Sequence, residues 1–371
     1  GLLSYAYTSS RFTHCYNTGT VIGGGDYAGG LIGDVNGKDF VVSDCVNYGD
    51  VMGSGMYGAG ISSSYEGVME RVVNYGNVES DSYAAGITGY ASDAKYVNCV
   101  NYGDVAMTGT TRDYAPAGGL MALNRASSMT NCYNLGKVTS TAYASGLIGD
   151  ARDDTSYGPF NVRNCYTAGE ISGPDSSYVS HVTASTDDEV LLDSVYYDIT
   201  VNRTVPYSNI DSTGIALSTR EMVHAALGDA YVERVGMYPV LAELADSVLS
   251  NWYAATVVLP EGFGPDSVAG PFIVGNPEGT TWTASPEIVT IDGNVATPTA
   301  TGEVTLTKTC GTHTRSYRLV VTMTTGVTDV DASDAAIVAR EYFNLNGQSL
   351  GTKRPESAGI YIERDRKIVV K

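Results

Sequence analysis

Cysteines have the widest chemical range of the residues in this chain, since thiols can form disulfides, bind metal ions or act as nucleophiles. Five of the six recur at one position of a repeated segment, namely Cys15, Cys45, Cys99, Cys132 and Cys165. No Cys-x-x-Cys pair or histidine recurs with that position, so metal binding is not indicated. Val72 fills the same position in another copy, which favours a buried column of free thiols over strained disulfides between parallel Cβ vectors.

Tyrosines form a second recurring set, and a row of aromatic rings with polar tips could stack on sugars. One group lies in Asn-Tyr-Gly turns, and we take its members as candidate ligand-binding residues: Tyr48, Tyr75 and Tyr102. Another group precedes a Gly-Leu or Gly-Ile element and comprises Tyr27, Tyr57, Tyr83 and Tyr143. Equivalent tyrosines could instead stack on each other as a structural ladder. The sequence alone leaves both interpretations open.

No further motif points to catalysis or to a cofactor. The histidines are scattered, without metal-ligand spacing: His14, His181, His224 and His313. Gly53–Gly58 matches the dinucleotide pattern G-x-G-x-x-G, but no helix follows it. The acidic groups that begin at Asp150 and Asp187 lack the ligand spacing of a calcium loop, so they indicate solvated loops. We expect no catalytic residue, no metal site and no cofactor.

An internal repeat must position these residues. A segment with the clearest form Cys-Val-Asn-Tyr-Gly-Asp-Val alternates with a Gly-Gly-Leu-Ile-Gly element, and copies recur about every 27 to 33 residues. Its asparagines are Asn17, Asn47, Asn74, Asn101 and Asn134. We predict that each asparagine occupies a turn position with a left-handed backbone, because Asn tolerates that conformation and the nearby Gly has no Cβ.

The repeat predicts the architecture. Each copy contains short β-branched and aromatic runs separated by Gly and Asn, with no apolar stripe long enough for a helix. A unit of this size cannot bury its own apolar face, so copies must stack with equivalent strands about 4.8 Å apart. The sequence therefore predicts an all-β protein in which residues 1–200 form a parallel β-solenoid of about six coils.

The two alternating elements, such as Ala28–Gly33 and Cys45–Val51, resemble the GLUG-motif repeats of bacterial surface proteins. Residues 10–250 share this resemblance, since Ser194–Asp198 and Tyr238–Leu241 look like the closing segment of that family. Members include adhesin-like proteins and proteins found beside IgA-specific peptidases. The resemblance implies a surface-exposed β-solenoid without an agreed catalytic site.

An exposed last coil would be an adhesive sheet edge, so residues 201–253 are expected to cap it. Ser218–Glu221 has the spacing of a capping box. Apolar residues behind it describe a short amphipathic helix: Met222, Val223, Ala226 and Leu227, with Gly228 at its end. A second helix is expected from the spacing of Leu241, Leu244, Val248 and Leu249.

Residues 254–325 are rich in Thr, Val and Pro and predict a small β-sandwich. Its expected strands are Thr256–Leu259, Phe272–Val274, Ile288–Ile291, Val304–Thr307 and Tyr317–Val321, with turns at Asp292-Gly293 and Gly311. The stretch Trp282–Val295 followed by Thr301–Leu306 resembles bacterial Ig-like domains of the intimin and invasin kind. That resemblance implies a spacer module.

Residues 326–371 predict three strands joined by an Asn-Gly turn and a polar hairpin. The elements Tyr342–Gly347, Gly359–Ile362 and Val369–Lys371 resemble the C-terminal sorting domain of Bacteroidota secreted proteins. This resemblance implies export and surface attachment.

Composition narrows the partner classes. With 22 basic and 41 acidic residues, the net charge is -19, which argues against nucleic acid and anionic membranes as partners. We find no apolar run long enough to span a bilayer. The chain starts at Gly1 without a basic and then apolar leader, as expected if a signal peptide has been removed or the sequence is truncated.

These observations predict a non-catalytic, adhesin-like monomer outside the cell, attached to the outer surface of a Gram-negative bacterium. One face of its solenoid would bind host or microbial glycans or an extracellular protein. The alternative is a carbohydrate-active or peptidase-associated β-helix protein that acts on an extracellular polymer. Lyases of that fold need clustered Asp with Lys or Arg, and basic residues are sparse in the first 200 positions, so we expect no enzyme.

Overall fold

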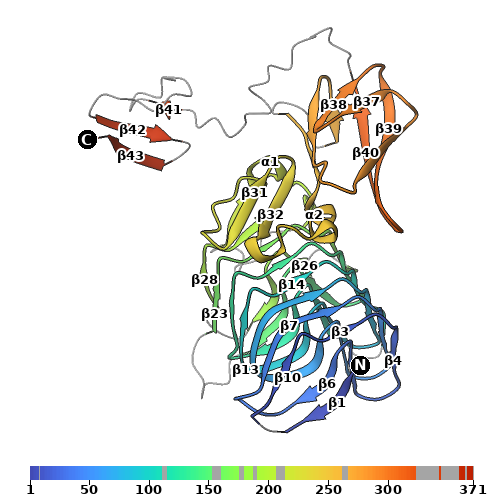
Figure 1. Ribbon diagram of the computed structural model, residues 1–371, viewed down its shortest axis with the longest axis vertical. Coiled ribbons are helices and arrows are strands. Elements are labelled where there is room, and N and C mark those ends of the chain that lie inside the picture. The colour runs from blue at the N-terminus through green and yellow to red at the C-terminus, as the bar shows by residue number, and fades with distance from the viewer. Residues whose placement is uncertain are drawn as a thin grey trace. The chain divides into compact units, whose positions relative to one another are not determined.

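The protein consists of two compact units. The computed structural model describes residues 1–7, 9–110, 115–152, 160–174, 179–186, 190–205, 214–260, 266–322, 342–343, 359–363 and 366–370. The first unit comprises Gly1–Val258 with Pro277–Thr280, and the second comprises Leu259–Asn276 with Thr281–Lys371. The first unit contains the β-solenoid, whose stacked coils run from the blue N-terminal end towards the green strands in Figure 1.

Three parallel sheets form the walls of the solenoid. One wall has six strands, namely β4 (Val21–Gly23), β8 (Val51–Gly53), β11 (Val78–Ser80), β15 (Val105–Met107), β20 (Val138–Ser140) and β25 (Ile171–Ser172). The next wall also has six, namely β5 (Tyr27–Gly29), β9 (Tyr57–Ala59), β12 (Tyr83–Ala85), β16 (Pro116–Gly118), β21 (Tyr143–Ser145) and β26 (Val179–Ser180). One strand per coil in each wall confirms the predicted parallel solenoid of about six coils.

The third wall is longer and bends at a corner within each coil. Before the corner lie β1 (Leu3–Ala6), β2 (Arg11–Thr13), β6 (Ile32–Val35), β13 (Thr88–Val97), β17 (Met121–Arg125), β18 (Ser128–Thr130), β22 (Ile148–Arg152), β23 (Phe160–Arg163), β27 (Thr183–Thr186) and β28 (Val190–Asp193). After it lie β3 (Tyr16–Asn17), β14 (Val100–Asn101), β19 (Tyr133–Asn134), β24 (Tyr166–Thr167) and β29 (Tyr196–Asp198), while β7 (Val41–Asn47) and β10 (Ser62–Asn74) continue through it.

Both repeated sequence elements contribute columns to the same core. The Gly-Leu or Gly-Ile element supplies buried side chains at Leu31, Ile61, Ile87, Leu120 and Leu147, and Val182 continues their column in the next coil. The cysteine column lies in the same cluster. Burying an aliphatic side chain of this size contributes about 1.5–3 kcal/mol, and each one packs on its copy in the next coil. The repeat is therefore stable only as a stack.

A ladder of side-chain amides runs through the interior beside this core. The Nδ2 group of Asn47 donates to Oδ1 of Asn74 at 2.8 Å, and the same bond links Asn74 to Asn101 and Asn101 to Asn134 at 2.8 Å. Each Nδ2 also donates to the carbonyl two residues ahead, as from Asn74 to Gly76 at 2.8 Å. Asn17 joins the exposed end of the ladder at 2.9 Å. The amides therefore satisfy one another from coil to coil.

The predicted left-handed turn at these asparagines is wrong. None of the five has a positive φ, and the left-handed residues stand instead just before the cysteine position, with φ between 51° and 58° at His14, Asp44, Arg71, Asn98, Asn131, Asn164 and Ser194. The glycine two residues after the asparagine is required for space in every one of these copies except the first, where a Cβ on Gly19 would make only an ordinary contact. A Cβ on Gly103 would lie 1.9 Å from the carbonyl oxygen of Gly76 in the neighbouring coil.

Residues 214–258 close the solenoid and cover part of one wall. The strand β30 (Ile215–Leu217) pairs with β29, and Ser218 begins α1 (Thr219–Met222) with the predicted capping box to Glu221. The hairpin of β31 (Tyr231–Arg234) and β32 (Met237–Leu241) follows, with η3 (Ala242–Leu244), α2 (Val248–Ala254) and β33 (Val257–Val258). The second predicted helix thus begins at Val248 and not at Leu241. We call residues 231–254 the cap.

The second unit contains small sheets. One includes β35 (Phe272–Val274), β38 (Val295–Pro298) and β37 (Val289–Asp292), and another is formed by β34 (Ser267–Val268), β40 (His313–Val321), β39 (Gly302–Cys310) and β36 (Thr281–Ser285). Gly293 and Gly311 have left-handed backbones, as the predicted turns require. The strands β41 (Tyr342–Phe343), β42 (Gly359–Glu363) and β43 (Arg366–Val370) form an antiparallel sheet.

The rest of the predicted sorting-like segment 326–371 lies outside the described residues. The Ig-like and sorting-domain assignments remain predictions. Within the described part of the chain, no helix has both the length and the hydropathy needed to cross a membrane.

Replacement of Asn74 by Ala tests the amide ladder. We expect the free energy of unfolding to fall by about 3 kcal/mol, because each buried polar group left without a partner costs about 1–3 kcal/mol. Urea unfolding followed by circular dichroism measures the change. The matched control is Asn17→Ala at the exposed end of the ladder, where a loss below about 1 kcal/mol is expected. Equal losses in both variants would show that the ladder does not stabilise the fold.

Candidate functional site

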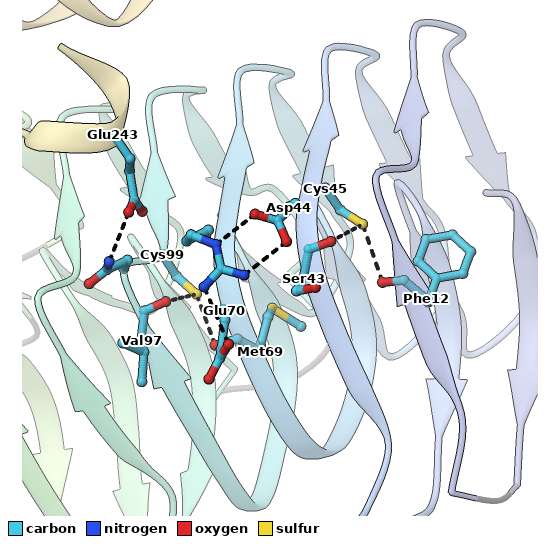
Figure 2. A network of polar contacts seen from close by, with 11 residues as sticks. Phe12, Ser43, Asp44, Cys45, Met69, Glu70, Val97, Cys99 and Glu243 are labelled. Carbon is cyan, nitrogen blue, oxygen red and sulfur yellow. Dashed lines mark hydrogen bonds and ion pairs between the residues drawn. The ribbon is translucent and has the colours of Figure 1, made fainter.

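The cysteine column is a stack of free thiols. Cys45, Cys99, Cys132 and Cys165 are buried, and Cys15 at the first coil is half-exposed. The Cys45 thiol donates to the carbonyl oxygens of Ser43 at 3.1 Å and Phe12 at 3.4 Å, as Figure 2 shows. Burial raises the pKa of Cys45 to about 11, so this thiol stays protonated. Val72 pairs with Cys45 in the same column. The buried thiols of the column therefore serve as packing groups.

Tyr48, Tyr75 and Tyr102 form a stack, but most of it is inaccessible. The ring centroids of Tyr48 and Tyr75 are 5.2 Å apart, and those of Tyr75 and Tyr102 are 5.1 Å apart, in nearly parallel planes. Tyr75 and Tyr102 are only 8% and 0% exposed, whereas Tyr48 is 47% exposed. The predicted ligand-binding surface of three tyrosines is therefore wrong for Tyr75 and Tyr102.

Burial of the stack results from the cap. The Tyr253 ring lies 4.9 Å from Tyr102 and 5.9 Å from Tyr75, and the Ser250 hydroxyl bonds to the Tyr75 hydroxyl at 2.6 Å. Glu243 accepts a hydrogen bond from Asn98 at 3.1 Å, and Figure 2 shows it reaching from the cap to the solenoid corner. These contacts lie more than 140 residues apart in sequence. Sequence patterns within one coil carry no signal of them.

The position of the stacked tyrosine relative to the asparagine of its coil changes beneath the cap. Tyr102 follows its asparagine, whereas Tyr133 precedes its own, so their rings meet edge to face at 77° and their hydroxyls bond at 2.6 Å. Tyr133 then stacks on Tyr166 at 4.7 Å. Tyr231 of the cap packs on both of these rings at 6.1 Å. The cap thus packs Tyr253 on the part of the stack before this change and Tyr231 on the part after it.

Beyond the cap, the same wall is open. His14, Cys15, Tyr16, Asp44, Val46 and Tyr48 line a shallow groove of about 390 Å³. We call this site the Tyr48 groove. Tyr16 is 66% exposed, and Tyr48 has one ring face against Tyr75 at the end of the stack. The groove is thus the uncovered end of an aromatic surface that elsewhere lies beneath the cap.

Asp44 supplies a fixed negative charge at the groove. Arg71 donates to its two carboxylate oxygens, from Nε at 2.6 Å and from the terminal nitrogen at 2.9 Å. The hydrogen bonds from Arg71 lower the pKa of Asp44 to about 2, so the carboxylate is ionised at neutral pH. Its partner sits one coil further on, at the equivalent corner position. A polar acceptor is thereby held beside two exposed aromatic rings.

The second tyrosine group is more accessible than the first. Tyr27 is 49% exposed and stacks on Tyr57 with centroids 6.0 Å apart, while Tyr57 meets Tyr83 at 4.9 Å. Tyr90 joins them at 5.7 Å from Tyr57. Arg125 places its guanidinium 5.7 Å from the centroid of the Tyr90 ring. The sequence pattern identified the first three of these tyrosines, but not Tyr90 or Arg125.

The remaining polar candidates do not assemble into a site. His181 is buried against Tyr197, and His224 lies 3.6 Å from Glu233. Among the described residues, no group of three His, Cys, Asp or Glu side chains is arranged to hold a metal ion. The acidic residues Asp153, Asp154 and 187–189 lie outside the described part of the chain.

Comparisons with known proteins assign neither a family nor an activity to this chain. No protein-family model matches the chain, and no curated protein sequence matches it. Among solved structures, the chain is similar to that of "a putative immunoglobulin A1 protease" from Bacteroides ovatus, with 17% identity and a TM-score of 0.47. The alignment covers 64% of this chain and 77% of that one.

Thiol titration tests the cysteine column. In the folded chain we expect a thiol reagent to modify the half-exposed Cys15 and Cys310 first, with the other four protected until the chain unfolds. Ellman's reagent with and without guanidinium measures both fractions. The double variant Cys15→Ser, Cys310→Ser is the control and should lose only the fast phase. Fewer than six reactive thiols in guanidinium would reveal disulfides and contradict the stack of free thiols.

Replacing Arg71 with Gln tests the electrostatics of the groove. We expect the pKa of Asp44 to rise from about 2 towards about 3.9, its unperturbed value. A lowered carboxyl pKa stabilises the fold above the unfolded pKa, and this contribution is lost as pH falls through about 2. Both side chains are partly exposed, so the stability at neutral pH should change by less than about 1 kcal/mol.

Carboxyl NMR titration measures this pKa. Arg163→Gln, which removes the exposed partner of Asp193 instead, is the control and should leave Asp44 unchanged. An Asp44 pKa that stays near 2 without Arg71 would contradict the assigned cause.

Proposed function

We propose that this chain is an extracellular, non-catalytic, adhesin-like protein whose Tyr48 groove binds a neutral sugar of a glycan. The observation that carries this proposal is the open end of the tyrosine stack beside an ionised carboxylate. Aromatic rings offer apolar surface to the faces of sugar rings, and their hydroxyl tips bond to sugar hydroxyls. The groove combines both kinds of contact.

Each groove residue has a role in this proposal. The Tyr48 face that is turned away from Tyr75 stacks on the sugar ring, and Tyr16 borders it. Asp44 accepts hydrogen bonds from sugar hydroxyls, because Arg71 keeps it ionised and fixed in place. Stacking on Tyr75 and the hydrogen bonds from Arg71 restrict both side chains before a ligand arrives, which reduces the entropy lost on binding.

The groove does not favour catalysis. Cys15 donates its thiol proton to the carbonyl oxygen of Thr13 at 3.3 Å. Within the described residues, no hydrogen bond joins this thiol to the His14 imidazole, so the pair lacks the nucleophile and base geometry of a cysteine hydrolase. The carbohydrate-active or peptidase-associated alternative therefore has no assembled set of catalytic groups to support it among those residues.

The cellular setting of this proposal rests on sequence. The resemblance to GLUG-repeat surface proteins and to the Bacteroidota sorting segment supports export and attachment to the outer surface of a Gram-negative cell. The net charge of -19 supports partners other than nucleic acid. We propose that the chain acts as a monomer, since one groove contains all the groups assigned to sugar binding.

A glycan array followed by calorimetry on selected hits tests the proposed function. We expect binding of a neutral glycan, and Tyr48→Ala should weaken it at least about tenfold, the equivalent of about 1.4 kcal/mol. The control Met52→Ala removes a similarly exposed apolar side chain from β8 of the same coil and should leave affinity unchanged. Selective binding that survives Tyr48→Ala would place the site elsewhere. Shortened glycan products after incubation would show an enzyme instead.

A further inference from the structure

The second tyrosine group meets an arginine where two walls of the solenoid join. Tyr27, Tyr57 and Tyr83 belong to β5, β9 and β12, while Tyr90 and Arg125 belong to β13 and β17 of the long wall. We call these five residues the Arg125 corner. They come from strands other than those that line the Tyr48 groove. The corner is thus a separate surface of the same unit.

Local sequence brings the two walls together at this corner. Gly89 leaves room for Tyr57, since a Cβ at Gly89 would lie 2.9 Å from the Tyr57 Cβ. Tyr57 and Tyr90 therefore meet with centroids 5.7 Å apart. Arg125 pairs with Ser92 on β13, two residues beyond Tyr90, which brings its guanidinium to the Tyr90 ring at 5.7 Å. The Arg125 guanidinium thus lies over the Tyr90 ring, within the distance of a cation–π contact.

Arg125 lacks the carboxylate partner that three other arginines have in the described part of the chain. Arg71, Arg163 and Arg318 each pair with a carboxylate. Arg125 is exposed and has no carboxylate partner in the described part of the chain. The exposed guanidinium is solvated by water, so an external anion can pair with it without breaking an internal ion pair.

The phenols of the corner add hydrogen-bond donors. Burial raises the pKa of Tyr57 to about 12 and also raises that of Tyr27, so both hydroxyls stay protonated at neutral pH. A guanidinium has donors only, and its planar fork matches a carboxylate. At the opposite end, the charge of Asp34 acts on Tyr27. The surface is therefore donor-rich near Arg125 and acidic near Tyr27.

We propose that the Arg125 corner binds a carboxylated sugar that ends an otherwise neutral glycan. The carboxylate pairs with the Arg125 guanidinium, and the sugar hydroxyls contact the phenols of Tyr57 and Tyr90. A single charge fits better than a polyanion, because Asp34 flanks the far end of the corner and the whole chain is acidic. This site goes beyond the proposed function, which concerns a neutral sugar in the Tyr48 groove.

Calorimetry on the full chain with three probes tests this proposal: sialyllactose, lactose and polygalacturonate. We expect sialyllactose to bind and the other two to bind at least about tenfold more weakly. Arg125→Gln should weaken sialyllactose binding at least about tenfold, because a charge-assisted pair is lost. The affinity should also fall as salt is raised.

Matched variants separate this site from the groove and from misfolding. Arg163→Gln removes an exposed arginine elsewhere and should leave sialyllactose binding unchanged, as should Tyr48→Ala. Tyr57→Phe keeps the ring but removes the hydroxyl, and is expected to weaken binding severalfold. Sialyllactose binding that is equal in Arg125→Gln, tighter binding of polygalacturonate, or no binding of any probe would each overturn the proposal. Loss of neutral-glycan binding in Tyr48→Ala alone would concern only the groove.

Discussion

The short spacing between hydrogen-bonded parallel strands restricts which residues this solenoid can contain. Each side chain in the walls lies beside the side chain at the equivalent position of the next coil, so the two must be compatible. An asparagine meets this condition with its own chemistry, since its amide nitrogen donates to the next amide oxygen, as from Asn74 to Asn101. Thiols and aliphatic groups satisfy it by packing, and tyrosines satisfy it by stacking. Glycines such as Gly103 satisfy it by leaving no Cβ in the way. The repeat is conserved along the chain for these reasons of fit.

The architecture was predictable because stacking has a signature within each coil. Valine replaces cysteine at Val72, which indicated that this position forms an interior column. The register that pairs Val72 with Cys45 follows directly from the repeat. The role of the asparagines was not predictable in the same way. A left-handed turn and a side-chain ladder both favour Asn, and the sequence does not distinguish them. The corner position has Asn in three successive coils, at Asn98, Asn131 and Asn164, but other residue types in the remaining coils, so its left-handed backbone leaves only a partial signal in the sequence.

The candidate site depends on contacts that no local pattern records. Tyr48, Tyr75 and Tyr102 occupy equivalent positions in successive coils, yet Tyr253 and Ser250 of the cap bury two of them and leave one open. Accessibility is therefore a tertiary property here. The Arg125 corner arises similarly, because Tyr90 and Arg125 lie in different coils and neither belongs to the repeated segments. A tyrosine ladder in the sequence indicates where aromatic surface exists, but the parts of it that meet solvent depend on the cap.

The coils of the solenoid are nearly identical, and the change in the tyrosine stack between Tyr102 and Tyr133 determines at which coils the cap packs. Tyr253 packs on Tyr102, which follows its asparagine, and Tyr231 packs on Tyr133, which precedes its asparagine. Among the described coils, both contacts form together only where these two kinds of tyrosine meet in this order. A slip of the cap by one coil would place one of these tyrosines on the wrong half. The length of open aromatic wall is then set by the number of coils on the N-terminal side of that junction. Duplication of a 27-residue coil on the N-terminal side of Tyr102 would add one tyrosine to the open wall and leave the contacts of the cap unchanged.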